Sequence, residues 1–397
     1  MRGTLTIRAI ATLSICLLAL ILTPHSRASE SAYTDLASEG IELAYNLHFD
    51  AATDVFDQLI ERFPEHPRGY LLRSVVFYYR TQLEEDHDRF SLKFLQAATD
   101  AISVAKKTLA QGGDRREALF SLGTTHIYLA AYYGWDGHWW KAYRYGKQGI
   151  ETLKRLIQHD PDYYDAYLGL GLYHYYTDVI PRFAKAVTFL LGIDSDRERG
   201  LRELRLAAEK GTYSRAEATL FLGSIHLYIE KNYATALGYF ERLATLYPDN
   251  SSFLMLLGEN YQKVGRPADA ARTLSRLVDE TVVPQFPVLV ISSYYRLGNL
   301  YFGMRDLPKA IQSYKRSLAL ASSSTGNVNW VFALANLNLG RSFDLLGRPQ
   351  EAMLYYKRVK RSDHKHAYEI AQAQMRRQGV KERPGMAEED DINPVYQ

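Results

Sequence analysis

Three histidines occupy equivalent places in a recurring motif, so they are the first residues to consider for chemistry. The motif Gly-x-x-His-x-Tyr places His126, His174 and His226 three residues after a glycine. Imidazole is a common metal ligand, but equivalent positions on stacked helices lie about 10 Å apart. The ligands of one zinc ion each lie about 2.1 Å from it. We therefore expect these histidines to be buried between helices, and we expect neither a metal site nor a cofactor.

No other group of residues assembles a recognisable catalytic pattern. The chain has one Cys, and it contains no HExxH, CxxC, Gly-x-Ser-x-Gly, calcium-loop or glycine-rich phosphate-loop motif. Acidic residues such as Asp160 and Asp162 fall in linkers, where a carboxylate favours the start of a helix. We expect a protein that is not an enzyme. The alternative is an enzyme whose site lies in the insertions of residues 132–196.

The dipeptide Leu-Gly recurs along the chain and marks a helical repeat. A ring follows three residues after each glycine, so the leucine and the ring are four residues apart and share one helix face. An alanine follows four of the glycines after 12 or 13 residues, and a large side chain comes four residues after that alanine. Small residues let two helices approach closely. We therefore expect each unit to form an antiparallel helix pair that must stack on its neighbours. The glycines are Gly123, Gly171, Gly223, Gly258, Gly298 and Gly340.

The repeat is regular at both ends of the chain and stretched in the middle. Near the N-terminus the same frame fits Gly40, Ala52 and Phe56. Successive glycines are 48 and 52 residues apart in the central units, against 35, 40 and 42 in the later ones. The first small residues that could complete the central units are Ala142 and Gly200. We therefore expect lengthened helices or insertions in the centre.

The spacing of glycine, ring, alanine and proline is similar to that of the tetratricopeptide repeat over roughly residues 33–365. This resemblance implies an all-α, superhelical solenoid of about eight helix pairs with lengthened central units. We expect divergent helical repeats with insertions in residues 33–214 and regular repeats in 215–375. A polar tail, residues 376–397, lacks apolar periodicity and is expected to be disordered. The stretched centre also has a likeness to the Iml-type branch of the family from mitochondrial outer membranes.

In each unit, a second face of the first helix is a candidate binding surface. Positions Gly−3, Gly+1 and Gly+5 lie about 200° around the helix from the ring position. The resemblance implies that this face lines a concave groove that holds a protein or an extended peptide. Tyrosine offers contact area and asparagine can bond a peptide backbone. In the alternative interpretation, the long helices and insertions fill the groove. The candidates are Phe120, Thr124, Tyr128, Tyr176, Tyr228, Tyr295 and Asn299.

The two insertions are the least regular parts of the sequence. Trp135, Trp139 and Trp140 lie in the first, and they could plug a long turn, form a patch for a partner, or dip into a membrane interface. Residues 177–196 contain an apolar run that could cap the solenoid locally. The same run could serve a membrane-associated assembly or transport factor, which is the main alternative to a scaffold.

The N-terminal segment predicts export. Residues 1–28 combine Arg2 and Arg8 with an apolar run of 15 residues and small residues at Ser26 and Ala28, as in a secretory signal peptide. Its removal leaves 45 basic against 45 acidic residues, and this neutrality argues against general nucleic-acid binding. In a bacterium the mature chain would lie in the periplasm, as a protein-binding scaffold of the cell envelope. The alternative is a leader that is retained as an anchor.

Overall fold

The computed structural model describes residues 24–179, 195–278, 286–324 and 328–377, and every regular element in these ranges is helical. They contain seventeen α-helices and one π-helical segment, η1. The helices are α2 (Pro24–Tyr45), α3 (Phe49–Arg62), α4 (Pro67–Leu83), α5 (His87–Ala110), α6 (Arg115–Trp135), α7 (Trp139–His159), α8 (Ala166–Val179), α10 (Arg197–Lys210), α11 (Arg215–Ser224), η1 (Ile225–Ile229), α12 (Tyr233–Leu246), α13 (Ser251–Lys263), α14 (Pro267–Arg276), α15 (Pro287–Gly303), α16 (Leu307–Ala321), α17 (Asn329–Leu345), α18 (Pro349–Tyr356) and α19 (Lys365–Arg377).

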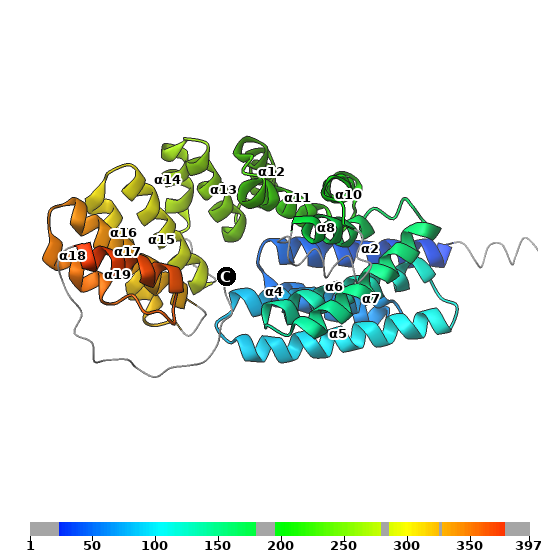
Figure 1. Ribbon diagram of the computed structural model, residues 1–397. Coiled ribbons are helices and arrows are strands. Elements are labelled where there is room, and N and C mark those ends of the chain that lie inside the picture. Colours follow the sequence, from blue (N-terminus) through cyan, green and yellow to red (C-terminus); the bar gives the residue numbers. More distant parts are fainter. Residues whose placement is uncertain (1–23, 180–194, 279–285, 325–327, 378–397) are drawn as a thin grey trace, which may run out of the picture.

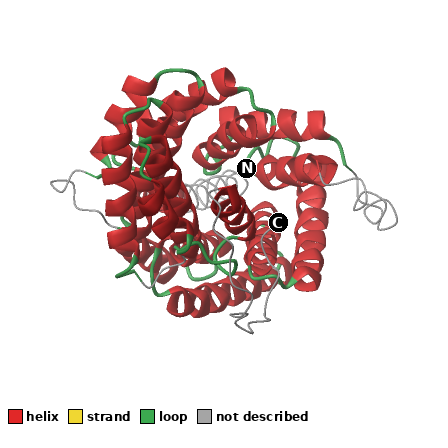
Figure 2. Cartoon of the chain, turned by 60° about the vertical axis from the view of Figure 1, so that its left-hand side comes forward, coloured by secondary structure: helices red, strands yellow, loops and turns green. Residues whose placement is uncertain are grey.

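The helices form eight successive pairs and a closing helix, as the sequence predicts. Pairs 1 to 4 are α2/α3, α4/α5, α6/α7 and α8/α10; pair 5 is α11 with η1 and α12; pairs 6 to 8 are α13/α14, α15/α16 and α17/α18. Helix α19 packs on α17 and α18 and ends the stack. The stack curves, with α4 to α7 in one part and α15 to α19 in the other (Figure 1). From the side the helices follow a circular outline (Figure 2).

In every pair except α4/α5, a glycine of the first helix lies against a large side chain of the second. An ideal Cβ at Gly223 would lie 2.8 Å from the Phe240 ring, and one at Gly258 would lie 2.7 Å from Leu274 Cγ. At Gly298 an added Cβ would overlap the Tyr314 ring. The predicted close approach is therefore confirmed, and the apolar core lies between the two helices of each pair.

The central pairs keep this contact but use glycine in place of alanine. Cβ atoms added at Gly123 and Gly171 would lie 2.8 Å from Leu153 and Leu204. Gly149 lies four residues before Leu153, and an added Cβ there would be 2.9 Å from the Gly123 carbonyl oxygen. The expectation that Ala142 completes the Gly123 unit is wrong, because α6 and α7 each have 21 residues and the crossing point lies further along α7.

Three expected segments lie wholly or largely outside the described residues. Residues 1–23 of the expected signal peptide are among them, and α2 begins at Pro24, so the expected cleavage point after Ala28 falls near its start. Residues 180–194 of the second insertion and 378–397 of the expected tail are the others. The division at residue 214 remains a prediction.

We predict that Gly298→Ala destabilises the fold by about 1–3 kcal/mol, because its Cβ cannot fit beside the fully buried Tyr314 ring. The matched control is Gly238→Ala in α12, where no atom lies within 4 Å of the added Cβ. That change should stabilise the protein by about 0.5–1 kcal/mol, because alanine is the better helix former. Urea unfolding followed by circular dichroism measures both. Equal effects of the two substitutions would contradict the close-approach account.

Candidate functional site

The first helices of distant pairs meet each other, so these helices line the inside of the curve. The Tyr79 hydroxyl of α4 donates a hydrogen bond to Glu217 Oε1 of α11 at 2.7 Å. The Tyr128 hydroxyl of α6 lies 2.7 Å from both carboxylate oxygens of Glu217. Pairs 2, 3 and 5 therefore touch across the inside, and the chain itself closes this part of the inner wall.

The Glu217 carboxylate is buried, and among the described residues it is held by tyrosines and has no cationic partner. Burial raises the pKa of Glu217, while the hydrogen bonds from Tyr128 and Tyr79 act in the opposite direction. A buried carboxylate without these donors would pay a large desolvation cost. The two hydroxyls are therefore the interaction that makes this closure stable.

A buried ion pair closes the same wall near the starts of the helices. Arg68 of α4 pairs with Glu117 of α6 at 2.5 Å, and the Tyr163 hydroxyl donates to the same carboxylate oxygen at 2.7 Å. The Arg68 guanidinium also lies over the Tyr213 ring, 3.9 Å from its centroid. Tyr163 and Arg68 both cover Phe120, whose ring centroid is 5.2 Å from the Tyr163 centroid.

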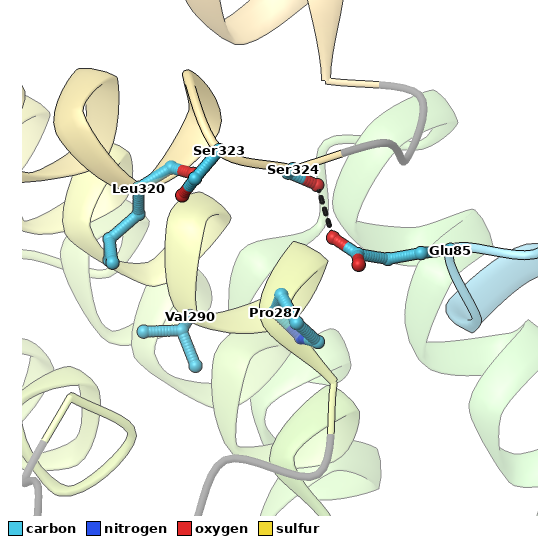
Figure 3. Close-up of a pocket in the computed structure, with 6 residues that line it drawn as sticks. All are labelled: Glu85, Pro287, Val290, Leu320, Ser323 and Ser324. Carbon is cyan, nitrogen blue, oxygen red and sulfur yellow. Dashed lines mark hydrogen bonds between the residues drawn. The ribbon is translucent and has the colours of Figure 1, made fainter.

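The first two pairs also contact pairs that follow much later in the chain. Asn250 Nδ2 at the start of α13 donates to the Tyr45 carbonyl oxygen at 2.6 Å, and the ring centroids of Phe49 and Phe286 are 5.5 Å apart. The Ser324 hydroxyl donates to Glu85 Oε1 at 2.6 Å beside a cavity of about 310 Å³ (Figure 3). The superhelix thus closes on itself, with pairs 1 and 2 in contact with pairs 6 and 7.

These contacts cover part of the predicted binding face. Phe120 and Tyr128 are buried by the closure, and Tyr295 is buried between Tyr314 and Trp330. The chain itself covers these three rings, as the groove-filling alternative expects for this part of the wall, and contact of these rings with a ligand remains a prediction. Thr124 and Asn299 are half-buried. Tyr176 and Tyr228 are 39% and 49% exposed, so they remain predicted binding residues.

A partly exposed row of polar side chains crosses the inner helices of pairs 5 to 8. The Tyr228 hydroxyl donates to Glu259 Oε2 at 3.0 Å, and Arg296 pairs with the same oxygen at 2.8 Å. Asn338 Nδ2 donates to Asn299 Oδ1 at 2.9 Å. We call this row the polar stripe, and it consists of Tyr228, Glu259, Arg296, Asn299, Asn338 and Arg341.

Sequence reasoning missed four members of the polar stripe. Glu259 and Arg341 each follow the repeat glycine directly, so the position that identified Asn299 also identifies them. Arg296 and Asn338 lie two residues before the glycine, three residues from that same position and therefore on the same helix face. The spacing of these four residues from the repeat glycines of pairs 6 to 8 would therefore have predicted them.

The three tryptophans of the first insertion lie on the surface. Trp135 ends α6 and Trp139 begins α7, and the side chains of Trp139 and Trp140 are 67% and 73% exposed. They do not fill the turn as a buried plug, because most of their area is open to solvent. A partner patch and a membrane interface remain predictions. Among the described residues no helix is long and apolar enough to cross a membrane.

The three histidines are buried between helices, as expected. The His126 ring stacks on Tyr145 with centroids 5.8 Å apart, and His226 stacks on Tyr239 at 5.9 Å. His174 lies 2.6 Å from a carboxylate oxygen of Glu203. In the described ranges no group of three or more possible ligand side chains gathers where a metal could bind. These rings take the place that other pairs give to tyrosine or phenylalanine.

We predict that Tyr128→Phe lowers the free energy of unfolding by about 1–3 kcal/mol, because it removes a donor from a buried carboxylate. Tyr176→Phe is the control and should have an effect within about 0.5 kcal/mol, because Tyr176 is exposed.

Glu217→Gln should be tolerated at pH 7. Because the pKa of Glu217 is raised in the folded state, protonated Glu217 stabilises the fold below about pH 4.5, and this stabilisation is lost as the pH rises. The Gln variant has no group that titrates there, so its stability should not show this loss. Unfolding curves at several pH values test both predictions. A Tyr128→Phe variant that is as stable as the original protein would contradict the closure.

We also predict that His126 makes the fold acid-sensitive. Burial lowers the pKa of His126 to about 4, so below about pH 6.5 the unfolded chain takes up a proton that the folded chain does not. Stability should therefore fall between pH 6.5 and 4, by at most about 1.4 kcal/mol per pH unit. His126→Phe should flatten this slope in urea titrations. An unchanged slope would show that the imidazole is hydrated in the folded protein.

Family models of the tetratricopeptide repeat match three segments of the chain: residues 194–251, 227–285 and 289–363. These segments run from just before the second helix of pair 4 to the turn before α19. No curated protein sequence matches the chain.

Several solved structures are similar to the chain at low sequence identity. PilW, described as a widely conserved type IV pilus biogenesis factor, is 16% identical, with 64% of this chain and 98% of that chain covered and a TM-score of 0.44. Pseudomonas aeruginosa PilF is 20% identical, with 66% and 99% covered and a TM-score of 0.42. MamA is 23% identical, with 40% and 85% covered and a TM-score of 0.31.

The family matches coincide with the pairs in which the glycine frame is most regular, and the same glycine contacts are present in pairs 1, 3 and 4. Residues 194–285 and 289–363 therefore contain tetratricopeptide repeats.

Proposed function

We propose that this chain is a non-catalytic scaffold that binds a protein, through an extended segment, along the polar stripe. The observation that carries the proposal is the partly exposed stripe itself, which continues over pairs 5 to 8 on the inner helices. Members of this family commonly bind proteins or peptides, and the inner wall of the earlier pairs is closed by Glu217 and Arg68. A ligand that uses the inner wall would therefore bind at the later pairs.

The chemistry of the polar stripe suits a peptide backbone. Asn299 and Asn338 bond each other through one donor and one acceptor, and each amide keeps further hydrogen-bonding capacity. The Tyr228 ring offers an exposed flat surface beside Glu259. Because these groups stand on packed helices, little conformational entropy is lost when a ligand binds. Affinity would come from a few such anchors.

We place this scaffold in the cell envelope. Residues 1–28 support export, and the near-neutral mature chain without cysteine suits an oxidising periplasm. A membrane-associated assembly or transport factor is the second candidate, and the exposed Trp135, Trp139 and Trp140 are the observation in its favour. That function would use the tryptophans and the apolar run of residues 177–196 in place of the polar stripe.

Site-specific photo-crosslinking in the native cell tests the scaffold proposal. A photoreactive residue in place of Tyr228 should give discrete protein adducts, whereas the same residue in place of Lys315, exposed on α16, should not. Asn338→Ala with Arg341→Ala should reduce the Tyr228 adducts severalfold while the fold is retained. No adduct at position 228, or the same adducts at both positions, would exclude binding along the polar stripe.

A further inference from the structure

The turn between α18 and α19 carries a concentrated positive charge at one tip of the molecule (Figure 1). Five exposed cations lie within nine residues, and Asp363 is the single carboxylate in that range. Within the described residues none of the five forms an ion pair. We call these residues the basic turn, and they are Lys357, Arg358, Lys360, Arg361 and Lys365.

Such a cluster creates a local field that favours an anionic neighbour. Like charges at this spacing repel one another, and the repulsion is relieved when carboxylates approach. Two other exposed cations of the later pairs do have such partners: Lys309 pairs with Asp306 and Arg348 with Glu351. The basic turn therefore has a charge that is complementary to an acidic segment.

The sequence supplies such a segment close by. Four consecutive carboxylates, Glu388 to Asp391, follow the end of α19 at Arg377. Apolar Ile392 comes directly after them, and Val395 lies three residues further on. We propose that the acidic run Glu388–Asp391 binds the basic turn of the same chain.

The lengths allow this contact. Helix α19 has 13 residues, so the basic turn at its start lies about 20 Å from its end. Glu388 lies eleven positions after Arg377, and an extended chain of eleven steps spans up to about 36–40 Å. The acidic run can therefore turn back along α19 and reach Lys365 with length to spare.

Tethering favours the chain's own run over a separate partner. A segment on a short linker is present at an effective concentration near the millimolar range. Exposed ion pairs contribute only about 0.2–1 kcal/mol each, so several pairs acting together are needed and an acidic partner of high affinity can still displace the run. The run would thus act as a competitor that limits weak binding of acidic proteins to this tip. The contact lies away from the polar stripe and does not depend on the proposed function.

Zero-length carbodiimide crosslinking of the full chain tests the proposal, because it joins only carboxylates and amines that are in contact. At low salt we expect amide links from residues 388–391 to Lys357, Lys360 or Lys365, at least about threefold above links to the exposed Lys106 of α5. Salt of about 1 M shortens the screening length to about 3 Å and should remove the difference. Isotopically labelled and unlabelled chains, mixed before the reaction, should give links within one chain.

Charge variants make the test independent of lysine reactivity. Arg358→Gln with Arg361→Gln keeps all three lysines and should lower the yield of these links severalfold. Arg144→Gln with Lys147→Gln removes two exposed cations from α7 and should leave the yield unchanged. Links spread evenly over exposed lysines, links mainly between two chains, or equal yields from the two variants would overturn the proposal. Loss of the links only when anionic lipid vesicles are added would support it, with the membrane as a competitor.

Discussion

The close approach of a glycine to a large side chain determines the geometry of every helix pair for which it is seen. Where Gly298 faces Tyr314 and Gly340 faces Tyr356, the absent Cβ lets the two helix axes come together around a fully buried ring. The pairs then stack through the remaining apolar faces, and their regular rotation curves the solenoid. Because the same contact recurs from Gly40 to Gly340, the curvature continues until the first pairs meet later ones.

That closure divides the inner wall into two chemically different parts. In the earlier pairs, Tyr79 and Tyr128 hold the buried Glu217 carboxylate, and Arg68 is paired with Glu117. These polar groups satisfy each other and leave little for a ligand. In pairs 5 to 8 the polar stripe is partly exposed, although these helices pair in the same way as the earlier ones. A single architecture therefore provides a rigid closed part and an accessible part, and the binding proposal rests on the second.

Local spacing predicted the helix pairs and their glycine contacts, because both depend on residues less than one repeat apart. It could not predict the burial of Phe120 and Tyr128, because the residues that cover them, Tyr163 and Glu217, lie about 40 and 90 positions away and meet them only through the curvature. The same limit explains the misplaced partner of Gly123: helix length, which spacing alone does not give, sets the crossing point at Gly149.

A distance between the first pair and pair 6 tests the closed superhelix most directly. The one Cys of the chain lies in the expected leader, so spin labels can be placed at two new cysteines, His48→Cys and Asp249→Cys, which are exposed and flank the contact of Asn250 with Tyr45. Pulsed electron resonance should give one narrow distribution at short distance. A broad distribution that extends to long distances would show an open superhelix and would contradict the closed inner wall.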